Sequence, residues 1–222
     1  MRLLLTSAGV TNTSIHDALL GVLGRPVADC DALCIPTALY GHPAVGPGAN
    51  AWNFITGRTD HMTGLGWRSV GVLELTALPS IYADRWVPKV READVLLVSG
   101  GDALYLNHWM RESGLAGLLP SLNETVYVGM SAGSMVLTPR IGQYFVEWAP
   151  PSGDDATLGV VDFSIFPHLD HPMLPYNTMA AAETWAAGIG GPAYALDDDT
   201  AIVVADGTVE VVSEGNWKRL RD

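Results

Sequence analysis

Basic residues are scarce in this chain. The 222 residues include 12 Lys and Arg against 24 Asp and Glu, a formal net charge of −12, and no Lys or Arg occurs from position 141 to position 217. Surfaces that bind nucleic acid or anionic membranes need clustered Lys and Arg. We therefore expect neither nucleic acid nor a membrane as a partner.

Cysteines and long hydrophobic runs are also rare. Cys30 and Cys34 are the two cysteines, and two ligands without nearby partners are too few for a zinc site, so we interpret them as buried thiols. The amino-terminal run MRLLLTSAG is too short for a secretory signal, and no stretch reaches membrane-spanning length. The sequence therefore predicts a soluble, cytoplasmic protein.

Two common phosphate-binding patterns are missing as well. Neither G-x-x-x-x-G-K-[ST] nor G-x-G-x-x-G occurs in the chain. We expect no nucleotide-binding loop of either kind, and nothing in the sequence calls for a metal or an organic cofactor.

Apolar residues, by contrast, make up 48% of the chain, enough for a large buried core. Continuous apolar runs predict five buried strands, and a helix is expected from Thr11 or Asn12 to Leu23 between the first two. Such alternation is typical of a parallel sheet covered by helices on both faces. We predict one α/β domain spanning residues 1–222, with strands over 2–9, 32–38, 69–76, 94–101 and 125–131.

The carboxyl-terminal part changes character. Residues 194–215 indicate short strands joined by turns, with a hairpin at Asp206-Gly207, so antiparallel strands are expected near the C-terminus. Residues 40–66 are rich in Gly and Pro, which indicates a long loop or a short irregular helix within loops. Such a segment can act as a lid or contact a partner, and its role stays open.

The most informative motif is Gly129-Met130-Ser131-Ala132-Gly133, at the end of the fifth predicted strand. G-x-S-x-G describes a nucleophile elbow, in which two glycines permit a sharp strand-to-helix turn with the serine at its tip. The N–H of Ala132 can then help to bind an oxyanion. The alternative interpretation is an ordinary Gly/Ser-rich turn.

A serine nucleophile needs an adjacent base, and His168 is the best candidate among six histidines. It follows an apolar strand in FSIFPHLDH (163–171), so it should lie at the carboxyl edge of the sheet, like Ser131. His171 is the competing candidate. A metal site made of His168, His171 and Asp170 is a further alternative.

A second glycine pair follows the fourth predicted strand. In VLLVSGGDALYL, Gly100 and Gly101 precede Asp102 and a helical stretch. Glycines let backbone N–H groups approach a ligand closely, and a helix N-terminus favours negative charge. This turn can therefore supply the other half of an oxyanion hole.

Together, the Gly-Gly turn, the G-x-S-A-G elbow and the Pro-His after a later strand resemble the peptidase E family. That clan of serine peptidases includes cyanophycinase and shares its fold with class I glutamine amidotransferases. The 37 residues from Ser131 to His168 also match the spacing in its aspartyl dipeptidases. The resemblance implies a three-layer, flavodoxin-like α/β fold, with Ser131 as nucleophile, His168 as general base, and Gly101 and Ala132 as oxyanion donors.

The third member of the triad is less well defined. The dipeptidases have an aspartate between the serine and the histidine, and an ungapped match places Val146 there, with Glu147 beside it. A carboxylate is needed to orient the imidazole and to stabilise its protonated form. We rank Glu147 first and keep the acidic turn of Asp197, Asp198 and Asp199 as the alternative.

The substrate pocket should also differ from that of the dipeptidases. Family members that select an N-terminal aspartate supply an arginine downstream of the histidine, and this chain has none there. Arg140 is the possible substitute. Asp102, where the family often has Asn, should add negative charge to the pocket rim. These departures predict a neutral or basic N-terminal residue rather than strict aspartyl specificity.

The leading hypothesis is a serine hydrolase that cleaves short peptides or small amino-acid amides through an acyl-enzyme, acting as a monomer or homodimer. Two alternatives remain. One is an esterase that uses the same elbow, although such enzymes place their histidine far toward the C-terminus and none follows His171 here. The other is a catalytically silent binding or regulatory domain of the same fold.

Overall fold

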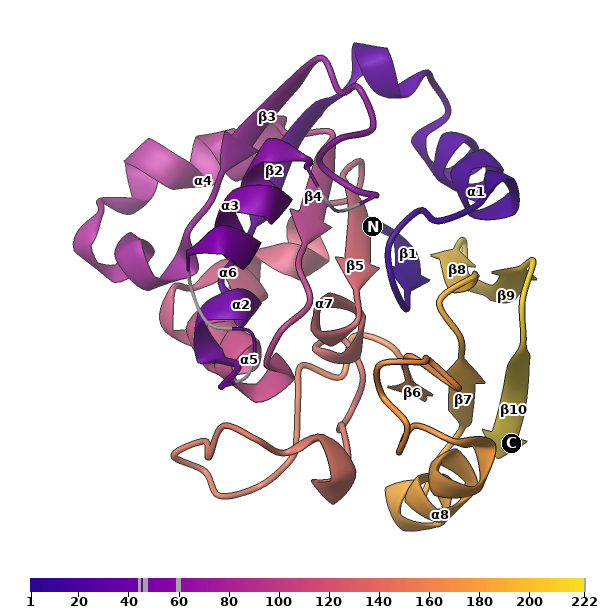
Figure 1. Cartoon of the computed structure of the whole chain (residues 1–222). Helices are drawn as coiled ribbons and strands as arrows, with labels where there is room; N and C mark the ends of the chain where they lie inside the picture. The colour runs from indigo at the N-terminus through magenta and orange to yellow at the C-terminus, as the bar shows by residue number, and fades with distance from the viewer. Residues whose placement is uncertain (44, 46–47, 59–60, 222) are drawn as a thin grey trace.

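The structure is a computed structural model that describes residues 1–43, 45, 48–58 and 61–221 (Figure 1). In these residues a seven-stranded sheet has the order β3-β2-β4-β5-β1-β8-β9. The parallel strands are β1 (Arg2–Thr6), β2 (Asp31–Ile35), β3 (Ser69–Val72), β4 (Val95–Val98) and β5 (Val126–Met130). All five predicted strands are therefore confirmed, although each is shorter than its apolar run.

Two antiparallel strands complete this sheet next to β1. They are β8 (Thr200–Ala205) and β9 (Thr208–Ser213). Asp206 and Gly207 join them with φ of 51° and 77°. Two positive φ values define the tight hairpin turn that Asp-Gly favours, so the predicted hairpin is confirmed.

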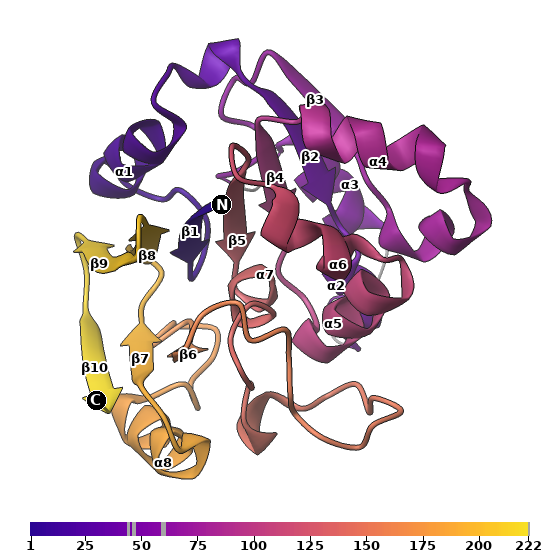
Figure 2. The ribbon, with the colours of Figure 1, turned by 180° about the vertical axis from the view of Figure 1, so that it is seen from behind.

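A second, three-stranded sheet lies beside the first, with β6 (Ser164–Phe166), β7 (Ala193–Leu196) and β10 (Trp217–Arg221) in the order β10-β7-β6. Helix α8 (Met179–Ile189) packs on it, as seen from behind in Figure 2. The sequence analysis did not predict a separate sheet, because apolar periodicity identifies strands but not which of them pair.

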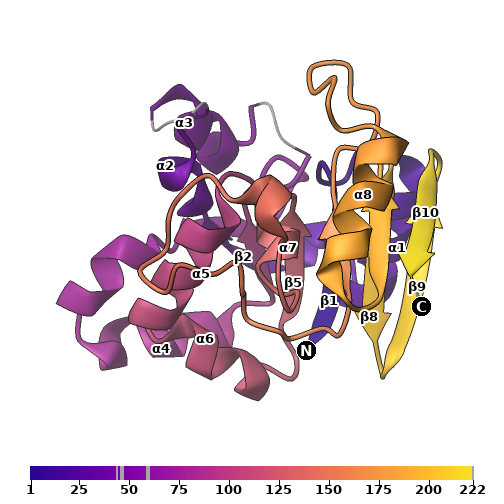
Figure 3. The same cartoon turned by 90° about the horizontal axis from the view of Figure 1, so that it is seen from below.

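Helices cover both faces of the main sheet. One face packs against α1 (Thr13–Leu23) and α3 (Ala49–Thr56), and the other against α4 (Ala83–Glu92), α5 (Ala103–Glu112) and α6 (Leu115–Leu118). Figure 3 shows α3 and α4 on opposite sides of the strands. Two four-residue helices and four 3-10 segments complete the fold: α2 (Ala38–Gly41), α7 (Ala132–Met135), η1 (Val27–Asp29), η2 (Leu75–Ser80), η3 (Leu119–Ser121) and η4 (Gln143–Phe145).

Helix α1 has the boundaries that its sequence indicates. The Asn12 side chain accepts a hydrogen bond from the Ile15 N–H, and Gly24, at φ 70°, ends the helix. The segment 40–66 contains the end of α2 and the whole of α3. Within it, residues 44, 46–47 and 59–60 lie outside the described residues.

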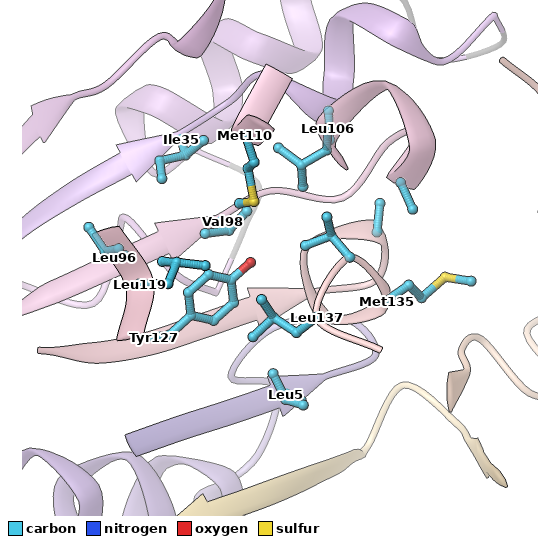
Figure 4. Close-up of a cluster of buried hydrophobic side chains, with 14 of the residues drawn as sticks. Leu5, Ile35, Leu96, Val98, Leu106, Met110, Leu119, Tyr127, Met135 and Leu137 are labelled. Carbon is cyan, nitrogen blue, oxygen red and sulfur yellow. The ribbon is translucent and has the colours of Figure 1, made fainter. Parts of the chain in front are cut away.

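The core beneath β5 is densely packed around Tyr127, which is fully buried (Figure 4). Burial raises the pKa of Tyr127 well above its usual value, so the phenol keeps its proton. Its hydroxyl donates a 2.6 Å hydrogen bond to the carbonyl of Gly133 in α7. This contact ties the turn that follows β5 to the core.

Both glycines of the G-x-S-x-G motif are required by close backbone packing. A Cβ on Gly129 would lie 2.5 Å from the Gly133 carbonyl oxygen, and one on Gly133 would lie 2.3 Å from the Val98 oxygen. Because all these neighbours are backbone atoms, a side chain cannot be accommodated without moving β4, β5 or α7.

We expect Gly133→Ala to lower the free energy of unfolding by about 1–3 kcal/mol, as overpacking does in other cores. The matched control is Gly188→Ala in α8, where an added Cβ meets nothing within 4 Å. That change should stabilise the protein by about 0.5–1 kcal/mol, because alanine is the better helix former. Urea unfolding of both variants checks the pair, and a Gly133→Ala protein as stable as wild type would contradict it.

Candidate active site

Ser131 is at the tip of a strained turn between β5 and α7. Its backbone has φ 50° and ψ −113°, a conformation that side chains rarely adopt and that costs of order 1–3 kcal/mol. Hydrogen bonds hold it there: the Ser131 N–H donates to the Thr6 carbonyl at 3.0 Å, and the Ser134 N–H donates to the Ser131 carbonyl at 2.8 Å. Such strain is typical of functional sites.

The Gly100-Gly101 turn lies against Ser131, as the sequence predicts. A Cβ on Gly100 would be 3.4 Å from the Ser131 Cβ. Gly101 has φ 130°, and a Cβ on it would lie 2.2 Å from the Ala38 carbonyl oxygen, so only glycine fits. The N–H of Ala132 is the first of α7 and has no helical acceptor four residues back.

His168 follows β6, and its ring contacts a carboxylate. Nδ1 of His168 lies 2.7 Å from Oδ1 of Asp198, which is on the turn between β7 and β8. Burial favours the neutral carboxyl, but the hydrogen bonds from His168 and from Ser7 outweigh it, so the pKa of Asp198 lies below its ordinary value. Asp198 is therefore ionised at neutral pH and holds the His168 ring through Nδ1.

A second imidazole shares this carboxylate. Nε2 of His171 lies 3.4 Å from Oδ2 of Asp198. Nδ1 of His171 accepts a hydrogen bond from the Met173 N–H at 3.1 Å, which leaves Nε2 as the donor in the neutral ring. His171 is thus directed at Asp198, and the alternative grouping of His168 and His171 with Asp170 is not the one that forms.

Glu147, the acid ranked first from the sequence, contacts His42 rather than His168. Its Oε2 lies 3.3 Å from Nε2 of His42, and the side chain is 46% exposed. The next residue, Trp148, donates its N–H to Oδ2 of Asp102 at 2.8 Å. That bond holds Glu147 on the Asp102 side of the site, whereas the acid that contacts His168 is Asp198.

The other two acids of the turn have different surroundings. Asp197 accepts hydrogen bonds from the Thr200 hydroxyl at 2.6 Å and the Asp199 N–H at 3.1 Å, so it shapes the turn itself. The Asp199 carbonyl accepts from the Asn12 side chain at 2.9 Å. Of the three carboxylates, only that of Asp198 is directed at the histidine.

A cavity of about 820 Å³ joins these elements. Ser131, Gly100, Gly101 and His168 line it together with His42 and Glu147, and apolar side chains form much of the rest. No Lys or Arg is among the described residues of its lining. In that part of the chain, the Ser131 hydroxyl and the His168 ring are not directly hydrogen-bonded.

Two charges differ from what the sequence suggested. Arg140 forms an ion pair with Asp155 at 2.9 Å and does not line the cavity, so it is not the substitute cation. Asp102 is 4% exposed and is the N-cap of α5, accepting from the Tyr105 N–H at 2.7 Å. Burial raises its pKa, against the effect of its backbone hydrogen bonds. Asp102 therefore does line the cavity, as predicted, but as a buried acid held by backbone hydrogen bonds rather than as an exposed charge at the rim.

Sequence reasoning missed Ser7, and it left open whether His42 lines the site or belongs to the surface. Ser7 contacts both His168 and Asp198, and His42 contacts Glu147. The available signal for Ser7 was its position directly after β1, at the sheet edge that carries Ser131. His42 is within the Gly- and Pro-rich segment, and the structure places it in the lining of the cavity.

The described residues form neither a metal-binding cluster nor a membrane-spanning helix. In the described residues, no group of three or more His, Cys, Asp or Glu is placed to hold a metal ion. Cys30 and Cys34 are buried and are not joined by a disulfide. None of the described helices has the length and apolar character needed to cross a bilayer.

Known structures resemble this chain over nearly its whole length. A protein from Listeria monocytogenes EGD-e, described as a peptidase E, has a TM-score of 0.69 at 19% identity, covering 96% of this chain and 98% of its own. A peptidase from an acI-B1 actinobacterium has a TM-score of 0.68 at 19% identity, covering 99% and 90%. At this identity the likeness establishes the fold, which is that of the peptidase E structures, as the sequence predicted.

The family assignment comes from the sequence itself. No curated protein matches the chain at a significant level. The sequence model of peptidase family S51, however, matches residues 3–212. The chain therefore belongs to peptidase family S51 and is a serine-type peptidase.

Proposed function

We propose that this peptidase hydrolyses the amide bond of short peptides or small amino-acid amides through an acyl-enzyme on Ser131. The observation that carries the proposal is the convergence of three features on one cavity: the strained Ser131 turn, the Gly100-Gly101 turn and the His168–Asp198 pair. Each feature alone is common, whereas their combination is the geometry of a serine hydrolase.

The first half of the reaction forms the acyl-enzyme. Asp198 accepts the Nδ1–H of His168, which leaves Nε2 of His168 free to take the hydroxyl proton as Ser131 Oγ attacks the carbonyl carbon. The N–H groups of Gly101 and Ala132 donate to the oxyanion of the tetrahedral intermediate. The C–N bond then breaks, and the amine leaves with the proton from His168.

The second half releases the product. His168 takes a proton from a water molecule, which attacks the ester carbon, and the proton then passes to Ser131 Oγ as the acid leaves. Substrate binding has to bring Ser131 and His168 into direct contact, because they are not hydrogen-bonded without it. Catalytic hydrogen bonds commonly shorten in this way when substrate binds.

The electrostatics of the cavity favour neutral or basic substrates. Glu147 is a half-exposed carboxylate in the lining, and no described Lys or Arg stands opposite it. An acidic side chain would lack a cationic partner there and would be repelled by Glu147. Strict aspartyl specificity is therefore not expected, and peptides with a neutral or basic N-terminal residue should be cleaved faster.

A dipeptide panel tests this activity. Peptides that are acidic, neutral or basic at the N-terminal position should be hydrolysed by wild type in the order basic or neutral above acidic. Ser131→Ala should lower kcat by about 10⁴-fold or more, because no other hydroxyl replaces the nucleophile. Equal turnover by wild type and Ser131→Ala would rule out the proposal, as would failure of a fluorophosphonate to label Ser131 in the folded protein.

The choice of acid is tested by a matched pair of amides. Asp198→Asn should lower kcat by about 10⁴-fold with little change in KM, because an amide holds the wrong tautomer of His168. Glu147→Gln should leave kcat within about tenfold for a neutral dipeptide, since Glu147 contacts His42 rather than His168. The reverse ranking in steady-state kinetics would restore Glu147 as the orienting acid.

A further inference from the structure

Ser7 is a buried hydroxyl at the centre of the site that the reaction scheme does not use. It follows β1 directly, its exposed fraction is 0%, and its N–H donates to the Thr200 carbonyl at 3.3 Å. Ser7 is therefore fixed at the carboxyl edge of the sheet between β5 and β8, the two strands whose ends carry Ser131 and Asp198.

The Ser7 hydroxyl joins the histidine to the acid a second time. Its oxygen accepts the His168 N–H at 2.7 Å, and its O–H donates to Oδ1 of Asp198 at 3.1 Å. The ring of His168 donates to the same Oδ1 at 2.7 Å. A closed ring of three hydrogen bonds results: the imidazole of His168 binds Oδ1 of Asp198 directly, and the His168 backbone N–H is linked to the same oxygen through the Ser7 hydroxyl.

The backbone of His168 needs such support. Its φ is 57°, the left-handed region that costs a residue other than glycine of order 1–3 kcal/mol. Asp170, two residues on, has φ 55°, and its N–H is held by the Asn177 carbonyl at 2.7 Å. The segment that carries the histidine is thus strained at two points, and Ser7 binds the first of them.

We propose that Ser7 is a positioning residue for the histidine and its acid. Its hydroxyl selects the His168 backbone conformation and the Asp198 rotamer together, so that Nε2 of His168 is directed toward Ser131. This inference rests on the proposed function, because it assigns Ser7 a role in the same reaction. It goes beyond that function by naming a residue that touches neither substrate nor nucleophile and yet controls turnover.

Threonine and valine provide a test of matched shape. Ser7→Thr and Ser7→Val add the same bulk to a fully buried position but differ in the hydroxyl. We expect Ser7→Val to lower kcat by about 10²-fold relative to Ser7→Thr with KM unchanged, the loss typical of a misplaced catalytic group. The rate of fluorophosphonate labelling at Ser131 should fall in parallel, which gives a readout that needs no peptide substrate.

Thr11→Val controls for a general loss of stability. The Thr11 hydroxyl donates to the backbone carbonyl of Asp198 at 2.9 Å and does not contact its carboxylate. Thr11→Val removes this one side-chain hydrogen bond and should lower the free energy of unfolding by about as much as other substitutions that remove one such bond. Its kcat and labelling rate should nevertheless stay within about threefold of wild type. If Thr11→Val loses as much activity as Ser7→Val, Ser7 has only a structural role.

Proton NMR gives a readout independent of turnover. The Nδ1–H of His168, held by Asp198, should give a deshielded resonance that disappears in His168→Gln. In Ser7→Val this proton should exchange faster with water than in Ser7→Thr. Unchanged exchange with unchanged labelling would overturn the role of Ser7 alone, whereas an active Ser131→Ala would overturn the proposed function itself.

Discussion

The pairing of β1 with β5 on one side and β8 on the other is the constraint on which the site depends. Thr6 lies opposite Met130 in β5 and Ala201 in β8. The residues just beyond these partners are Ser131, which donates its N–H to the Thr6 carbonyl, and the turn that carries Asp198. The register of β1 with its two neighbours therefore places Ser131, Asp198 and Ser7 at the same level along the edge of the sheet. A one-residue slip of either pairing would turn every side chain to the opposite face.

Strain and close packing compensate each other at this edge. Ser131 and His168 both have positive φ, and each unfavourable backbone is held by a hydrogen bond from the end of β1. The glycines around them permit backbone approaches that no side chain allows, so α7 starts directly against β4. The unfavourable backbone energy of these two residues is offset by packing in the core below them. The Tyr127 hydroxyl, bonded to the Gly133 carbonyl, fixes the turn after β5 to that core, so the groups of the site are held rigidly.

The sequence was most informative where local physics dominates. Buried strands, the Asn12 cap, the Asp206-Gly207 hairpin and the glycines near Ser131 follow from apolar runs and backbone sterics, and the structure contains each of them. The position of the acid was not determined in this way. Whether Glu147 or Asp198 reaches His168 depends on how β8 pairs with β1 and on Asp102 holding the Trp148 backbone, and both are contacts between distant parts of the chain. The separate sheet of β6, β7 and β10 escaped prediction for the same reason.

Because Glu147 contacts His42 and not His168, its carboxylate is part of the cavity lining. The proposed orienting acid has to be directed at Nδ1 of His168, and Asp198, half-buried and bound by Ser7, His168 and His171, is placed for that role. Glu147 is 46% exposed, and its carboxylate lies 3.3 Å from the His42 ring in the lining of the cavity. Arg140 is bound to Asp155, and no Lys or Arg is among the described residues of the lining. Under the proposed function, the arrangement that places Asp198 against His168 therefore also leads us to expect a preference for substrates without negative charge.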